Sequence, residues 1–209
     1  MSKGNTKPSG ATSYKETAFG ILSRAKLLAL EIEGTKKGLE YIHDLLKIDQ
    51  NVEITPQLIC KIHATSFQWI FPDWGGMFRT IQVTYSEKEA PQYFQIPELI
   101  ENLCADLRIR LKNLPKPTEA IFIDQVVELL AWFQHQFVFI HPFQDYNGRV
   151  GRMLTIFLLL KLGLPAAEIQ VEKKEDREKY LKAMQAGDEG NLALLEKLMS
   201  ETLTEALKV

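Results

Sequence analysis

The chain has 209 residues, of which 45% are hydrophobic and 25% charged, and its formal net charge is -2. This length supports one sizeable hydrophobic core, and the balance is that of an ordinary globular protein. A slightly acidic chain lacks the broad positive surface that nucleic-acid binding needs, so we expect no nucleic-acid partner. A local basic pocket for a phosphate ligand is still allowed.

The cysteines, the N-terminus and the apolar runs indicate the cellular compartment. The two cysteines, Cys60 and Cys104, lie among apolar residues and fit neither a metal motif nor a disulfide framework. The N-terminal residues lack the apolar core of a secretory signal, and residues 1–14 are predicted to be a flexible tail. The longest apolar run, around 153–160, is far too short for a membrane span. We therefore expect a cytoplasmic protein without membrane contact.

Helical patterns follow this tail. Apolar residues recur at helical spacing over about 18–34, and Gly34 is placed to end that helix. A second helix is expected over 37–48. A third is expected to begin at Pro56, with Thr55 as its N-cap.

The middle of the chain changes character. Residues 71–91 are rich in Pro and Gly and include the alternation of Ile81, Val83 and Tyr85, which predicts a loop and a short hairpin. The pattern then favours a mainly α domain, because further helices are predicted over 96–114, 118–140, 151–163, 175–187 and 191–208.

The stretch FIHPFQDYNGRVGR, residues 139–152, places several polar residues just before an apolar helix. The first amides of a helix lack internal partners and the helix dipole is positive there, so this end suits an anion. Arg149 and Arg152 lie three residues apart in the first turns, where a phosphate chain would stabilise them. Asp145 suits Mg²⁺ shared with substrate phosphates, and His141 is the usual type of general base near neutral pH.

Each of these residues also has an ordinary structural interpretation. Asp-x-Asn-Gly is commonly a turn, and two arginines on a helix commonly form a solvated face. The combination instead favours phosphoryl or nucleotidyl transfer to a protonated nucleophile. The remaining histidines, His43, His63 and His135, show no metal-binding spacing, and we expect them to be structural.

The run from His141 to Arg152 resembles the Fic family signature HPFx[D/E]GNGRxxR, with Tyr146 where the family has glycine. FPDWGGMFRTIQV resembles the family's segment before its flap hairpin, and YLKAMQAGDEGN resembles the border of its adenine site. The resemblance covers about residues 15–205. It implies a Fic-like helical bundle with one small β-hairpin, in a single domain over 15–209.

Most Fic enzymes transfer AMP from ATP to a hydroxyl side chain of a protein, and the resemblance implies the same here, with Mg²⁺ as cofactor. His141 would deprotonate the target hydroxyl, Asp145 would hold Mg²⁺, and Pro142 and Phe143 would be structural. The implied nucleotide- and phosphate-binding residues are Tyr146, Asn147, Gly148, Arg149, Gly151, Arg152, Tyr180 and Asp188. The implied flap, which would hold the target by strand addition, is Thr80, Ile81, Gln82, Val83, Thr84 and Tyr85.

The resemblance further implies an inhibitory helix over about 18–34. Many family members carry [S/T]xxxE[G/N], whose glutamate pairs with the second arginine of the signature and blocks the γ-phosphate site. ALEIEG, residues 29–34, matches at Glu33 and Gly34 but has Ala29 in place of the hydroxyl residue. We expect Glu33 to pair with Arg152. The alternative is an exposed glutamate before a capping glycine.

The implied reaction is AMP transfer to a Ser, Thr or Tyr hydroxyl of a protein, which can be the enzyme itself. Other functions also stay open. Tyr146 and Ala29 depart from the family pattern, which leaves a nucleotide-sensing module with little turnover as the alternative. Transfer of a different nucleotide is another. A kinase-like branch has Lys in place of Gly148 and lacks the last arginine, so Gly148 and Arg152 favour AMP transfer. The identity of the target stays open, and so does the oligomeric state, for which a homo-oligomer is one possibility.

Tyr146 is the odd member of the signature. An anion site built from backbone amides tolerates a side chain if it points away from the phosphates and φ is negative. We therefore expect a negative φ at Tyr146, with the ring facing outward or packing beside the loop.

Overall fold

The computed structural model describes residues 4–5 and 14–208, so nearly all of the expected tail lies outside the described residues. The described chain is mainly α-helical, as predicted, with α4 at its centre. The helices are α1 (Arg24–Ile48), α2 (Pro56–His63), α3 (Ile96–Lys112), α4 (Phe122–Ile140), α5 (Asn147–Lys161), α6 (Lys174–Asp188) and α7 (Ala193–Ala206).

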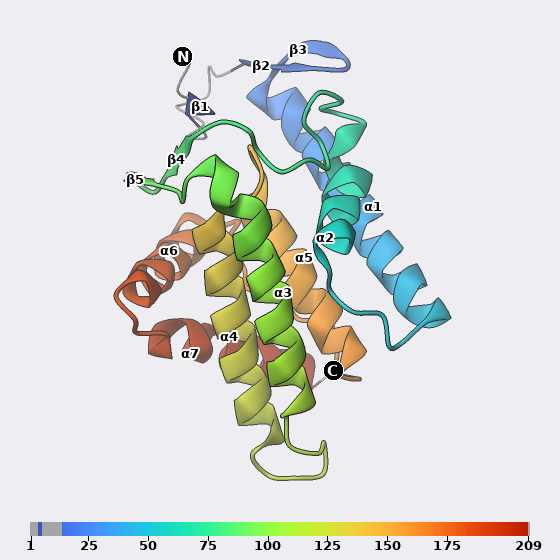
Figure 1. Ribbon diagram of the computed structural model, residues 1–209, viewed down its shortest axis with the longest axis vertical. Helices are drawn as coiled ribbons and strands as arrows, with labels where there is room; N and C mark the ends of the chain where they lie inside the picture. Colours follow the sequence, from blue (N-terminus) through green and yellow to red (C-terminus); the bar gives the residue numbers. More distant parts are fainter. Residues whose placement is uncertain (1–3, 6–13, 209) are drawn as a thin grey trace.

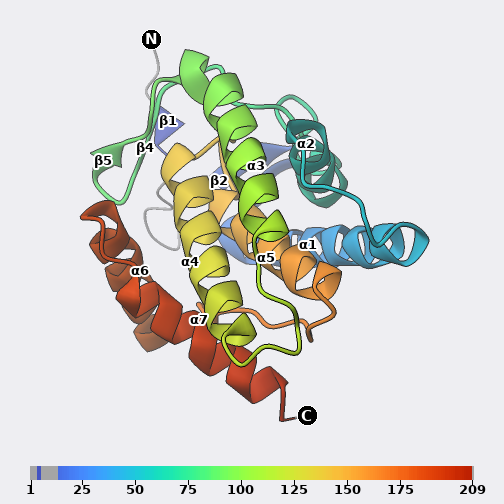
Figure 2. The same ribbon diagram turned by 60° about the horizontal axis from the view of Figure 1, so that its bottom comes forward.

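Helix α4 is apolar on nearly all sides because other helices surround it. It packs against α3, α5, α6 and α7, with α6 and α7 together on one side (Figures 1 and 2). Phe133 and Phe137 are fully buried on it, and Phe157 of α5 joins them in the core. No helix in the described part of the chain is both long enough and apolar enough to cross a membrane.

Helix α1 differs from the prediction, which ended one helix at Gly34 and began another at residue 37. It runs unbroken through both Gly34 and Gly38, because these residues face η1, the π-helix Ala64–Gln68. A Cβ on Gly34 would lie 2.2 Å from the Ser66 carbonyl oxygen, and one on Gly38 would lie 2.1 Å from its Oγ. The glycines therefore allow two helices to approach closely and do not act as caps.

The start of the expected helix is also wrong, since residues 14–23 form a hairpin of β2 (Tyr14–Thr17) and β3 (Gly20–Ser23). Gly20 has φ +82°, which favours glycine and a turn. Thr17 closes this turn, because its Oγ1 donates to the Gly20 carbonyl at 2.7 Å and accepts from the Phe19 amide at 3.1 Å.

Two local predictions are confirmed. Helix α2 begins at Pro56, and the Thr55 side chain accepts a hydrogen bond from the Leu58 amide at 3.1 Å. The predicted hairpin is β4 (Val83–Tyr85) with β5 (Lys88–Glu89), and the 3-10 turn η2 (Tyr93–Gln95) leads from it into α3. On its other edge β4 pairs in parallel with β1 (Gly4–Asn5), which gives the sheet order β1-β4-β5.

Candidate active site

The signature stretch is the connection between α4 and α5. Helix α4 ends at Ile140, the next residue, His141, has φ +51°, and α5 begins at Asn147. The buried Asn147 side chain closes the loop, because Oδ1 accepts from the Phe143 amide at 2.8 Å and Nδ2 donates to the Phe143 carbonyl at 2.9 Å. The first turn of α5, with its free amides, is thereby held next to His141.

His141 has the protonation state of a general base. Its Nδ1 lies 3.1 Å from the Val138 carbonyl, which can only accept, so Nδ1 carries the proton and Nε2 is the basic nitrogen. Burial lowers the pKa of His141 to about 4, so the ring is neutral near pH 7. The ring also stacks on Tyr85 of β4, with centroids 4.2 Å apart.

The backbone conformation of Tyr146 differs from the prediction. Its φ is +65°, not negative, a conformation that costs a bulky residue about 1–3 kcal/mol. This is the conformation that glycine adopts readily, which explains the glycine of the family signature. The ring packs beside the loop, as one of the two predicted placements, and stacks on Phe67 at 4.2 Å and Trp74 at 6.1 Å. These stacking contacts offset part of the backbone strain.

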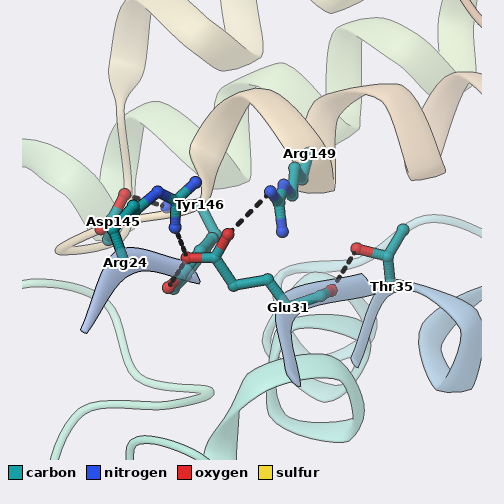
Figure 3. A network of polar contacts seen from close by, with 6 residues as sticks. All are labelled: Arg24, Glu31, Thr35, Asp145, Tyr146 and Arg149. Atoms are coloured by element: carbon teal, nitrogen blue, oxygen red, sulfur yellow. Dashed lines mark hydrogen bonds and ion pairs between the residues drawn. The ribbon is translucent and has the colours of Figure 1, made fainter. Parts of the chain in front are cut away.

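The Tyr146 hydroxyl belongs to what we call the Glu31 cluster, namely Arg24, Glu31, Tyr146 and Arg149 (Figure 3). Glu31 is only 1% exposed, and its Oε1 accepts from Arg24 and, at 2.8 Å, from the Tyr146 hydroxyl. Its Oε2 accepts from Arg149 Nη2 at 2.8 Å. Burial raises the pKa of Tyr146, so its hydroxyl keeps the proton that it donates.

The predicted Glu33–Arg152 pair is wrong. Glu33 is exposed on α1, because residues two apart on a helix point in directions about 200° apart and Glu31 takes the buried face. Arg152 instead donates from Nε to Glu168 at 2.8 Å and from Nη1 to the Gly148 carbonyl at 3.1 Å. The glutamate from α1 therefore reaches the first arginine of the signature and not the second.

The two arginines lie at the N-terminal end of α5, as predicted. Arg149 Nη1 is buried and has no hydrogen-bond partner among the described residues, so this arginine retains donor capacity for an anion. Gly151 was also predicted to bind phosphate, and its surroundings indicate a packing role. It is buried against α4, where a Cβ would lie 3.2 Å from Gln134 and from Phe137, so it serves close helix packing.

A small pocket of about 40 Å³ lies between the β4–β5 hairpin and α6. It brings together two predicted residues, Tyr180 and Asp188, with Tyr85 and Lys88 of the hairpin. The buried Tyr180 hydroxyl accepts from Gln134 Nε2 at 2.7 Å. The predicted residues of this region therefore line one concave surface.

Asp188 is the centre of a second group, the Asp188 cluster of Lys88, His135 and Asp188. His135 Nε2 lies 3.1 Å from Asp188 Oδ1, and the Lys88 ammonium pairs with Oδ2. Gly187 packs against the His135 ring, where a Cβ would lie 2.5 Å from Cδ2. The cluster joins the hairpin to α6 at the edge of the pocket.

Only part of the predicted flap is a strand. Val83–Tyr85 forms β4, whereas Thr80 is exposed and lies, with Ile81 and Gln82, in irregular backbone before it. The edge of β4 that a target strand would use pairs with β1.

Sequence reasoning missed Arg79, which links the flap to the signature loop. This 4% exposed side chain donates from Nε to the His141 carbonyl at 2.8 Å, and its backbone amide donates to the Pro142 carbonyl at 2.9 Å. Its other guanidinium nitrogens bind the carbonyls of Ile81 and Pro91. Burial lowers the pKa of Arg79 to about 10, so it stays charged. The sequence signal was its place in FPDWGGMFRTIQV, to which no role was given.

Other residues that the prediction missed are Glu31, Lys88 and Glu168, while His63 was expected to be structural. No motif marks the first three, because their partners lie far away in sequence. The helical period around Glu31 could have indicated that it shares the buried face of Leu27 and Gly34.

A buried neutral histidine, a carboxylate and two arginines at a helix N-terminus are groups that suit a class of site for phosphate binding and proton abstraction. The chain belongs to the Fic/DOC family, whose model matches residues 53–159.

Curated relatives support this assignment. The chain is 29% identical over 187 residues to "Protein adenylyltransferase Fic" of Nematostella vectensis, which covers 89% of this chain and 42% of that protein. It is 29% identical over 191 residues to the protein of the same name from Aedes aegypti, with 91% of this chain and 36% of that protein covered. The chain thus spans less than half the length of these relatives.

Solved structures show the same fold. Fic-1 from C. elegans superposes with a TM-score of 0.69 at 21% identity, covering 85% of this chain and 49% of that one. BepC from Bartonella tribocorum, with bound AMPPNP, superposes with a TM-score of 0.67 at 18% identity, covering 93% and 94%.

Proposed function

We propose that the protein is a protein adenylyltransferase, which transfers AMP from ATP to a Ser, Thr or Tyr hydroxyl of a protein target. The observation that carries the proposal is the position of a neutral histidine, with its Nε2 as acceptor, beside a helix N-terminus that carries two arginines. The names of the curated relatives agree with it.

In this reaction the target hydroxyl gives its proton to His141 Nε2 and its oxygen forms a bond to the α-phosphorus of ATP. The bond from that phosphorus to the bridging oxygen breaks, and pyrophosphate leaves. The amides at the start of α5, with Gly148 among them, are assigned to the phosphate oxygens, and Arg149 and Arg152 to the outer phosphates. Arg149 Nη1, buried without a partner among the described residues, supports this assignment.

Mg²⁺ is proposed to bind at Asp145. The described residues contain no group of three or more His, Cys, Asp or Glu side chains that could hold a metal alone. Mg²⁺ commonly uses one or two carboxylates together with substrate phosphates, so the single carboxylate of Asp145 fits it. When bound, Mg²⁺ would neutralise charge on the phosphates.

The nucleoside is assigned to the pocket between the hairpin and α6, which Tyr180 and Asp188 line. For the target we propose the outer edge of β4, where an added strand would lie next to Tyr85 and the His141 ring. Since β1 pairs with this edge, the target would have to displace Gly4–Asn5. Self-modification remains part of the proposal, and the free thiols of Cys60 and Cys104 agree with a cytoplasmic setting.

Glu31, and not Glu33, is proposed to restrain the enzyme. It occupies Arg149 Nη2 from the neighbouring helix, so the phosphates of ATP compete with a buried carboxylate for this arginine. The same contact favours the alternative function, a nucleotide-sensing module with little turnover.

Incubation with labelled ATP and Mg²⁺, alone and in cell lysate, tests the proposal. We expect AMP on the protein or on a lysate protein, and none with His141→Ala. Competition among labelled nucleotides tests transfer of a different nucleotide. Binding of ATP without covalent transfer, in the wild type and in Glu31→Gln alike, would favour the sensing module.

A further inference from the structure

We propose that His63 is a positioning residue, which sets the direction of the Asp145 carboxylate by holding the peptide bond that follows it. His63 ends α2 and lies 82 positions before Asp145, yet its Nε2 is 3.2 Å from the Asp145 carbonyl oxygen. The proposal rests on the proposed function, in which Asp145 binds Mg²⁺ together with ATP.

The contacts of His63 determine which nitrogen carries the proton. The Gly76 amide donates to Nδ1 at 2.8 Å, so Nδ1 is the acceptor and Nε2 is protonated. Nε2–H therefore donates to the Asp145 carbonyl. The side chain is 0% exposed, and Nδ1 carries no proton because it accepts the Gly76 amide hydrogen, so the ring is neutral.

The peptide between Asp145 and Tyr146 is held at both ends. His63 binds its carbonyl oxygen, and Asp145 Oδ1 accepts a hydrogen bond from its N–H, the Tyr146 amide, at 2.7 Å. Because a peptide unit is planar, the two contacts together restrict ψ of Asp145 and φ of Tyr146. The Asp145 carboxylate is thus hydrogen-bonded to a peptide plane whose orientation His63 sets.

This restraint matters more here than in a loop with glycine. Tyr146 has φ +65°, so the loop stores strain that neighbouring contacts must offset. The His63 ring also stacks on Phe143, with centroids 3.9 Å apart, and Phe143 is fully buried. One histidine therefore supports the loop by packing and the Asp145 peptide by a hydrogen bond, and the two roles can be separated.

Two amide variants separate them. His63→Gln retains a hydrogen-bond donor at the position of Nε2. His63→Asn retains the acceptor at the position of Nδ1 but has no donor at the position of Nε2. Both lose the ring that stacks on Phe143, and they differ from each other by one methylene. Exposed His43 on α1 supplies a control through His43→Asn.

Calorimetric titration of the full chain with ATP, with and without Mg²⁺, is the measurement. Mg²⁺ raises the affinity for ATP, and we expect this increase to be about tenfold smaller in His63→Asn than in the wild type. Mutation of a residue that orients a metal ligand typically weakens metal binding by about this factor. His63→Gln and His43→Asn should retain this gain, and Mg²⁺-free affinity should be unchanged in all three.

Equal behaviour of the two His63 variants would overturn the positioning role and leave a packing role. Absence of any Mg²⁺ effect in the wild type would overturn the metal part of the proposed function, and the His63 proposal with it. Nitrogen NMR of the histidines tests the proposal on the wild type alone, so its result does not depend on whether the variants fold. It should show a neutral His63 ring protonated at Nε2, and the Nδ1–H form would contradict the proposal.

Discussion

The Glu31 cluster and the Asp188 cluster both join elements that are distant in sequence by ion pairs, but they differ in burial. Glu31 is 1% exposed, whereas Lys88 and Asp188 are 32% and 24% exposed. A buried charge that loses its partner is expensive, while a pair near solvent contributes little to stability. We infer that the Glu31 cluster is both a structural element and a competitor for phosphate, and that the Asp188 cluster serves as a reversible contact at the pocket.

Removal of the charge of Glu31 has the largest expected effect. Glu31→Gln leaves Arg24 and Arg149 without their carboxylate, which should lower the free energy of unfolding by about 3–5 kcal/mol. ATP affinity should rise about tenfold, because binding no longer breaks a charge-assisted hydrogen bond of about 1.5–3 kcal/mol. Denaturant unfolding and calorimetric titration measure the two quantities.

Glu33→Gln is the matched control, two residues away on the exposed face of the same helix. It should change neither quantity. If Glu33→Gln raised ATP affinity and Glu31→Gln did not, the assignment of the competitor would be reversed.

The second prediction concerns pH. Burial lowers the folded-state pKa of both His63 and His141 to about 4, below the ordinary value of 6.5. The unfolded chain therefore binds more protons than the folded chain in that window, so the free energy of unfolding should fall as pH falls from about 6.5 toward 4. Catalytic efficiency should stay level from neutral pH to below 6, because the His141 base is still unprotonated there.

Urea unfolding and a pH–rate profile over the same range check this prediction. A rate that falls with an apparent pKa near 6.5 would show that His141 titrates like an exposed histidine.

The Asp188 cluster should show a smaller effect. Lys88→Met removes its partially exposed ion pair and should lower the free energy of unfolding by no more than about 1 kcal/mol. Since Lys88 and Asp188 line the pocket, the KM for ATP should change more than kcat. If Lys88→Met lowered the free energy of unfolding as much as Glu31→Gln, the two clusters would not differ in their contribution to stability.

Deletion of residues 1–13 should have the smallest effect. It removes β1 from the edge of β4 and leaves the β2–β3 hairpin. If a target adds to that edge, the KM for the target should fall severalfold while stability is unchanged. An unchanged KM would argue against strand addition at this edge.

Sequence reasoning reached the features whose signal is local. The cap at Thr55, the hairpin at Val83–Tyr85 and the helix after Asn147 each follow from neighbouring residues. The signature loop was found because its members are adjacent in the chain.

What it missed depends on contacts between distant segments. Gly34 was expected to end a helix, but the close approach of Ser66 gives that glycine a packing role. The motif indicates Glu33 and not Glu31, because a motif records spacing and not which face of a helix is buried. The positive φ of Tyr146 and its hydrogen bond to Glu31 arise only when both helices are in place.

The role of His141 as the base in AMP transfer can be tested by the intact mass of the full chain after incubation with ATP and Mg²⁺, for wild type, Glu31→Gln and His141→Ala. We expect an added AMP on the wild type, more on Glu31→Gln, and none on His141→Ala. An AMP adduct on His141→Ala equal to that of the wild type would show that transfer proceeds without His141 as its base.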